Sequence, residues 1–233
     1  MANVYSDKED LYSALEYYRK SLTIQLHNMG ENHPELATSY DNIANVYHEK
    51  GELDQALEYH HKSLTIKLNS LGENHPDVAE SLHNMGVLYM EKSQFDKAED
   101  ALNKSVRIKL KLVGENHAIT AMSYASLGQV YAIQGHIDRA YKCHHKVIAI
   151  YLENLPEDHP VLSDCYRNLG VTHLKKQELD EALSFHEKSL SSCGWISSWH
   201  WGRLQTQGNL QQAKANFQLS LQILQNISGG NHF

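Results

Sequence analysis

A five-residue string, GENHP, recurs with small changes along the chain, where it begins at Gly30, Gly72, Gly114 and Pro156. Each step is 42 residues long, and residues 35–76 match residues 77–118 at 17 of 42 aligned positions. A fixed period of this length is typical of arrays in which each repeat packs only on its neighbours. The chain therefore does not need one large globular core to fold.

Each repeat contains two apolar stripes at helical spacing. The first lies in residues 35–50, with apolar side chains every three or four positions, and Gly51 is expected to end that helix. The second lies in residues 53–71 and ends at Gly72. The proline of GENHP suits the first turn of the next helix, where its missing N–H costs nothing. One repeat is therefore predicted to be two antiparallel helices joined by short turns.

Small residues occupy one column in each helix of the repeat. In the first helix the column is Ala44, Gly86, Gly128 and Gly170; in the second it is Ala14, Ala56, Ala98, Ala140, Ala182 and Ala213. Three residues after the first column, a bulky column holds Tyr47, Tyr89 and Tyr131. HEAT and armadillo repeats share the two-helix period but do not require both small columns. The arrangement resembles the tetratricopeptide repeat, which implies an all-α fold: a right-handed superhelix (α-solenoid) of antiparallel helix pairs.

The loop GENHPD at residues 72–77 and the phrase VAESLHNMGVLY at residues 78–89 resemble the repeats of kinesin light chains. The resemblance covers residues 2–190 well and 207–233 in part. It implies a concave groove in which asparagines of the first helices grip the backbone of an extended cargo peptide. The resemblance also implies association with a kinesin heavy chain complex and a role in cytoplasmic, microtubule-based transport by a motor protein. The second asparagine of the family's pair is present at Asn42, Asn84 and Asn168, and the first is absent.

The resemblance places a peptide-binding groove on the first helices. Its candidate residues are Asp41, Asn42, Asn45, Glu80, His83, Asn84, Ser126, Gln129, Arg167, Asn168 and Lys175. Amide side chains both donate and accept hydrogen bonds, as the backbone of an extended peptide requires. The expected groove is mixed in charge and most cationic near Arg167.

The regular register stops after residue 190. Residues 1–190 form the predicted array, whose first helix is truncated, and residues 207–233 match the second helix of a degenerate last repeat. The irregular segment 191–206 between them contains every tryptophan of the chain, namely Trp195, Trp199 and Trp201. Two interpretations of this segment stay open, an exposed binding anchor and a mis-spliced or frame-shifted stretch. The ends suggest a piece of a longer protein or an array that associates through its uncapped ends.

Composition restricts the partners. The formal charge of −7 argues against nucleic acid, whose binding needs clustered Lys and Arg. No apolar run is long enough for a membrane span, and the N-terminus lacks the pattern of a signal peptide, so a cytoplasmic location is expected. The odd number of cysteines, three, fits reduced thiols.

No metal site, cofactor or enzymatic activity is predicted. The loop histidines His33, His75, His117 and His159 recur 42 residues apart, and stacked repeats would hold them about 10 Å apart, too far to share one zinc ion. Capping or packing beside proline is their expected role, and no motif of a catalytic or phosphate-binding site occurs. The predicted function is a protein–protein interaction adaptor. Two alternatives stay open: a self-associating structural array, or a repeat fragment of a larger signalling or enzyme chain.

Overall fold

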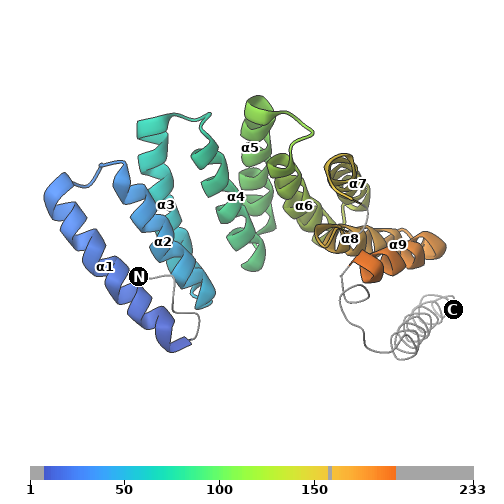
Figure 1. Cartoon of the computed structure of the whole chain (residues 1–233), viewed down its shortest axis with the longest axis horizontal. Helices are drawn as coiled ribbons and strands as arrows, with labels where there is room; N and C mark the ends of the chain where they lie inside the picture. Colours follow the sequence, from blue (N-terminus) through green and yellow to red (C-terminus); the bar gives the residue numbers. More distant parts are fainter. Residues whose placement is uncertain (1–7, 157–158, 193–233) are drawn as a thin grey trace. The chain divides into compact units, whose positions relative to one another are not determined.

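The computed structural model describes residues 8–156 and 159–192, and these residues form helices and turns without any strand (Figure 1). In chain order the helices are α1 (Lys8–Met29), α2 (Glu35–Glu49), α3 (Leu53–Leu71), α4 (Pro76–Glu91), α5 (Phe95–Val113), α6 (Ala118–Ile133), α7 (Ile137–Asn154), α8 (Val161–Lys175) and α9 (Leu179–Ser192). By their contacts, the described residues divide between Ile150 and Tyr151 into two compact bodies, an N-terminal and a C-terminal one. Each body is described by itself below.

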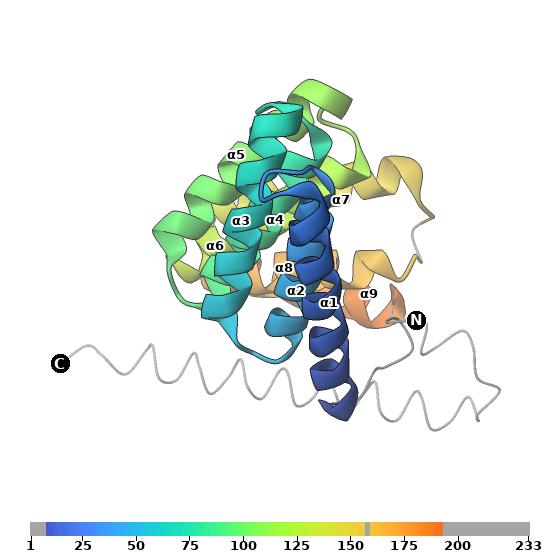
Figure 2. The same ribbon diagram turned by 90° about the vertical axis from the view of Figure 1, so that its left-hand side faces the viewer.

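The helices alternate as the repeat predicts, and the fold is an all-α tetratricopeptide-type solenoid. In the N-terminal body, each even-numbered helix is the first helix of a repeat and packs against the second helix that follows it, as in the pairs α2–α3 and α4–α5. Second helices also pack against the next first helix, so α1 contacts α2, α3 contacts α4 and α5 contacts α6 (Figures 1 and 2). The first helices α4 and α6 touch directly as well. In the C-terminal body, α8 pairs with α9.

The turn inside each repeat uses a left-handed backbone conformation. Gly51 ends α2 with a φ of 75°, and the equivalent Gly135 has a φ of 81°. Ser93 and Gln177 occupy the same position with φ of 57° and 65°. A non-glycine residue pays a steric cost of about 1 kcal/mol there, so the turn geometry persists without the glycine that predicts it.

The small first-helix column allows the paired helices to approach closely, as predicted. A Cβ atom added to Gly86 would lie 2.6 Å from Leu102 Cγ, and one added to Gly128 would lie 2.5 Å from the His144 ring. Ala44, in the same column, is completely buried. The facing residues differ in chemistry, since one is the apolar Leu102 and the other is the imidazole of His144. Both are nevertheless buried, at 0% and 3% exposure. The column therefore fixes the distance between helices rather than the identity of the facing side chain.

The ends of the array fall partly outside the described residues. Helix α9 continues to Ser192, two residues into the segment predicted to be irregular. The rest of that segment, with its three tryptophans, and the predicted last helix in 207–233 lie outside the described residues, as do residues 1–7. Among the helices that are described, none combines the length and apolar character needed to cross a membrane.

Candidate peptide-binding face

The candidate residues of the N-terminal body lie on one face of the first helices, here named the first-helix face. Its positions are spaced by three or four residues along each helix, which keeps them on the same side, except that Asp41 and His83 directly precede Asn42 and Asn84. The positions are Asp41, Asn42, Asn45, Glu80, His83, Asn84, Ser126 and Gln129. Asn42 and Asn84 are half-buried and Asn45 is exposed. Among the described residues, the structure gives the side chains of Asn42 and Asn84 no hydrogen-bond partner.

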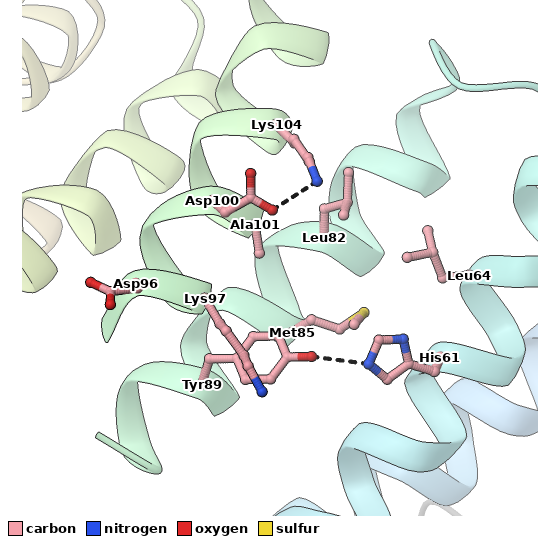
Figure 3. Close-up of a pocket in the computed structure, with 10 residues that line it drawn as sticks. All are labelled: His61, Leu64, Leu82, Met85, Tyr89, Asp96, Lys97, Asp100, Ala101 and Lys104. Atoms are coloured by element: carbon pink, nitrogen blue, oxygen red, sulfur yellow. Dashed lines mark hydrogen bonds and ion pairs between the residues drawn. The ribbon is translucent and has the colours of Figure 1, made fainter. Parts of the chain in front are cut away.

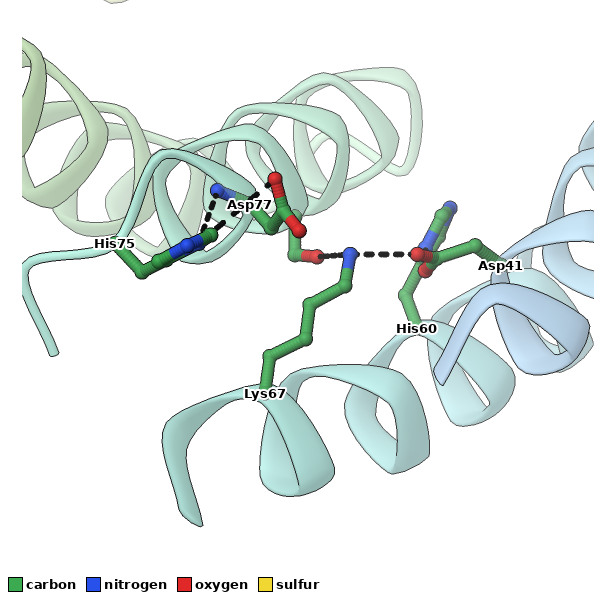
Figure 4. Close-up of polar contacts among 6 residues, drawn as sticks. Asp41, His60, Lys67, His75 and Asp77 are labelled. Atoms are coloured by element: carbon green, nitrogen blue, oxygen red, sulfur yellow. Dashed lines mark hydrogen bonds and ion pairs between the residues drawn. The ribbon is translucent and has the colours of Figure 1, made fainter. Parts of the chain in front are cut away.

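Asp41 is held by its own chain rather than presented to a ligand. Lys67 Nζ donates to Asp41 Oδ2 over 2.6 Å and to Ser81 Oγ over 2.8 Å, which joins α2, α3 and α4 (Figure 4). His60 Nδ1 lies 3.0 Å from Asp41 Oδ1 and is its donor, because an ionised carboxylate only accepts. Burial alone would raise the pKa of Asp41, but the bonds from His60 and Lys67 together lower it.

His83 stands in the next repeat where Asp41 stands in the first, and its surroundings differ. Lys109, which replaces Lys67, donates to Ser123 Oγ over 2.8 Å, and that hydroxyl lies 3.2 Å from His83 Nδ1. Lys109 is 7% exposed, and the structure gives it no ion pair among the described residues. Burial lowers the pKa of Lys109, with a smaller opposing effect of Glu80. Burial, and then the Lys109 charge, lower the pKa of His83 to about 4, so its ring is neutral at pH 7.

The remaining predicted residues divide between the two bodies. Glu80 is exposed, Gln129 is half-buried, and the Ser126 hydroxyl donates to the Met122 carbonyl over 3.4 Å. In the C-terminal body, the Arg167 guanidinium pairs with Asp164 over 2.8 Å, so the cation expected to attract ligands already has a carboxylate. Asn168 is half-buried and Lys175 is exposed on the same helix, α8.

The loop histidines cap the first helices, as predicted. His75 Nδ1 accepts a hydrogen bond from the Asp77 backbone N–H over 3.2 Å (Figure 4). The same bond, two residues apart in sequence, is made by His33, His117 and His159. Each satisfies a backbone donor that the first turn of a helix leaves unpaired. These ring nitrogens therefore stabilise the N-terminal ends of the first helices.

Sequence reasoning missed a polar tether at the bulky tyrosine column. The hydroxyl of Tyr89 lies 3.0 Å from His61 Nε2, and Arg19 donates to the hydroxyl of Tyr47. Each pair is 28 residues apart and joins a first helix to the second helix of the preceding repeat. A polar residue 28 positions before each tyrosine is the sequence signal that could have revealed it.

Comparison with known proteins agrees with this geometry. The family model described as "Tetratricopeptide repeat" matches residues 1–69, 37–111, 77–152 and 119–193. The chain belongs to the tetratricopeptide repeat family. Repeats of this family are protein-interaction modules and typically non-catalytic scaffolds. A search of curated proteins finds no match.

Solved tetratricopeptide structures share the fold of this chain. BtubC (BKLC) from P. vanneervenii superimposes with a TM-score of 0.76 at 23% identity, covering 86% of this chain and 80% of that one. The Podosopora anserina putative kinesin light chain, with nearly identical TPR-like repeats, gives a TM-score of 0.72 at 22% identity, covering 85% and 94%. The neighbours of this tetratricopeptide array thus include kinesin light chain-like proteins.

A hollow between α3 and α5 is lined by residues of α3, α4 and α5. It is a pocket of about 360 Å³ (Figure 3). Its apolar lining includes Leu64, Leu82 and Met85, and the His61–Tyr89 hydrogen bond crosses one end. Asp96, Lys97 and the ion-paired Lys104 and Asp100 add charged groups to its lining. This pocket was not predicted from the sequence.

Proposed function

We propose that this chain is an adaptor that binds an extended segment of a partner protein along the first-helix face. One observation carries the proposal. Asn42 and Asn84 repeat 42 residues apart with unused amides, whereas their neighbours Asp41 and His83 are bonded to the chain itself. Both side chains are half-buried and still reach solvent, so a ligand backbone can replace the water that satisfies each amide with a matched donor and acceptor.

The geometry of the array suits an extended ligand. Packed helices lie about 8–10 Å apart, and an extended chain advances about 3.3 Å per residue. Where neighbouring first helices pack directly, as α4 and α6 do, their side chains would meet the ligand backbone about every third residue. Each amide can accept from a backbone N–H and donate to a carbonyl, so this recognition depends little on the ligand's side chains.

The resemblance to kinesin light chains in loop and first-helix sequence supports an extension of this proposal. The extended segment would belong to a cargo protein, and the adaptor would act in the cytoplasm with a kinesin heavy chain complex on microtubules. Binding of purified kinesin heavy chain in the presence and absence of the peptide ligand tests this extension separately from the groove itself.

The groove is tested by replacing both amides in the full chain, as Asn42→Ala with Asn84→Ala. Twelve-residue random peptides displayed on phage are selected against the unmodified chain, and the affinity of an enriched peptide is measured by fluorescence anisotropy. We expect at least a tenfold weaker affinity for the double variant, because two amide pairs to the backbone are lost.

Two exposed amides on α3 provide the matched control, as Gln55→Ala with Asn69→Ala. This control should bind the peptide as the unmodified chain does, and circular dichroism should show equal helix content in all three proteins. Equal affinity of the Asn42/Asn84 variant and the control would contradict the proposed function.

A further inference from the structure

The first-helix face changes its chemistry between α4 and α6. Three large apolar residues of α6 are exposed along one side of the helix: Ile119 at 47%, Met122 at 53% and Ile133 at 53%. The equivalent positions are Glu35, Thr38 and Glu49 in α2, and Asp77, Glu80 and Glu91 in α4. Every charged position of α4 on this side is thus apolar in α6. The first turn of α6 accordingly contains no acidic residue.

Next to this apolar side, α4 presents carboxylates to solvent. The Asp77 side chain is 54% exposed, and Glu80 is exposed without an ion pair among the described residues. The nearest buried cation, Lys109, is only 7% exposed and lies beneath the surface. A ligand that crosses from α4 to α6 therefore meets negative charge first and then an apolar surface.

We infer that the bound segment carries a basic side chain opposite α4 and a large apolar side chain against Ile119 and Met122. This inference rests on the proposed function and specifies two side chains of the peptide that the first-helix face would bind. Equivalent positions on neighbouring first helices lie about 10 Å apart, so the two ligand side chains are about three residues apart. Charge complementarity with Asp77 and Glu80 selects the basic residue, and removal of apolar surface from water drives the second contact.

The decisive variant gives α6 the residues that α4 already has, as Ile119→Asp with Met122→Glu. Because α4 forms a helix with Asp77 and Glu80 at these positions, the array tolerates them. A matched control places acids at exposed apolar sites of second helices, as Ile24→Glu with Leu71→Glu, where exposure is 62% and 42%. A third variant, Glu80→Gln, removes one carboxylate and keeps the shape.

The probe is the same selection of random twelve-residue peptides, carried out on the full chain and on each variant. We expect the enriched peptides to share a basic residue and a large apolar residue three positions apart. Affinity measured by anisotropy should fall at least tenfold in the Ile119/Met122 variant and stay within twofold in the control. Glu80→Gln should weaken binding about threefold and reduce its dependence on salt.

Each other outcome is distinguishable. Peptides that need Asn42 and Asn84 but bind the Ile119/Met122 variant equally well would overturn this inference and leave the proposed function standing. Enrichment of acidic peptides would also overturn it. If binding is unaffected by Asn42→Ala with Asn84→Ala, the proposed function itself fails. If no peptide is enriched and sedimentation velocity shows self-association that the Ile119/Met122 variant abolishes, the ligand is a second copy and the inference is wrong.

Discussion

Two equivalent lysines of the array have different electrostatic environments. Lys67 bonds to a carboxylate of its own chain, Asp41, and also reaches Ser81 of the next repeat. Lys109 occupies the same position 42 residues later, but His83 replaces the carboxylate and Ser123 is its hydrogen-bond acceptor. Both lysines are largely shielded from water, at 12% and 7% exposure.

This difference shows that helix packing and charge balance are set separately in a repeat protein. The helices around both lysines pack in the same way, because both repeats have a small residue, Ala44 or Gly86, where the first helix meets the second. A buried ammonium without a carboxylate carries an uncompensated desolvation cost. The second repeat therefore bears a cost that the first avoids, and the following substitutions measure it, from the largest expected effect to the smallest.

The largest effect is expected from Lys67→Met, compared with Lys109→Met. The first substitution removes the lysine that pairs with the partly buried Asp41 carboxylate, and should cost about 2 kcal/mol of unfolding free energy. The second removes a desolvated charge without stranding a carboxylate, and should lie within about 1 kcal/mol of the unmodified chain or above it. Urea denaturation followed by circular dichroism measures both, and equal destabilisation by the two substitutions would contradict the comparison.

A smaller, pH-dependent effect is expected from His83→Asn. In the folded chain the pKa of His83 is about 4, below its ordinary value of 6.5. Between these values the unfolded state binds a proton that the folded state does not, so stability falls as the pH drops from 6.5 towards 4. His83 should account for about 1–2 kcal/mol of that fall, at about 1.4 kcal/mol per pKa unit and with allowance for solvent screening.

A second ring, that of His144, contributes to the same pH dependence. Its pKa is also lowered to about 4, mainly by burial, so it titrates in the same range. The unmodified chain and His83→Asn should therefore both lose stability in acid, with the unmodified chain losing more. Parallel curves of stability against pH for the two proteins would show that His83 contributes nothing.

The smallest effect is expected from His83→Asp, which gives the second repeat the carboxylate of the first. Lys109 would gain a partner like that of Lys67, and we expect a stabilisation of about 1 kcal/mol at pH 7, after the cost of burying a second charge. For a chain of this size, the melting temperature should rise by about 2–4 °C. A lower melting temperature would mean that the geometry around Lys109 does not admit an ion pair.

The fold could be predicted closely from the sequence, because its determinants are local. Helix α3 spans the 53–71 stretch predicted from its apolar stripe, and α2 ends one residue before Lys50. The close contacts at Gly86 and Gly128 follow from the small column. These features depend on side-chain size and on a period of 3.6 residues, both of which are visible in one chain segment.

The candidate site was less predictable, because it depends on which long side chains reach across helices. Nothing in the sequence near Asp41 shows that Lys67, 26 residues later, occupies its carboxylate. The hydroxyl bond of Tyr89 to His61 likewise depends on the packing of neighbouring repeats. The amides of Asn42 and Asn84 could be predicted as groove residues by resemblance, but their unused hydrogen-bonding capacity required the structure.

The tyrosine tethers have a mechanical consequence. Each hydroxyl joins a repeat only to the second helix before it, so a pulling force applied to the ends of the N-terminal body loads these junctions in series. The junctions would then open one at a time rather than together. A repeat that unfolds after its junction opens would release about 42 residues, or about 140 Å of extended chain. An array built in this way can lengthen in steps under tension while its remaining repeats stay folded.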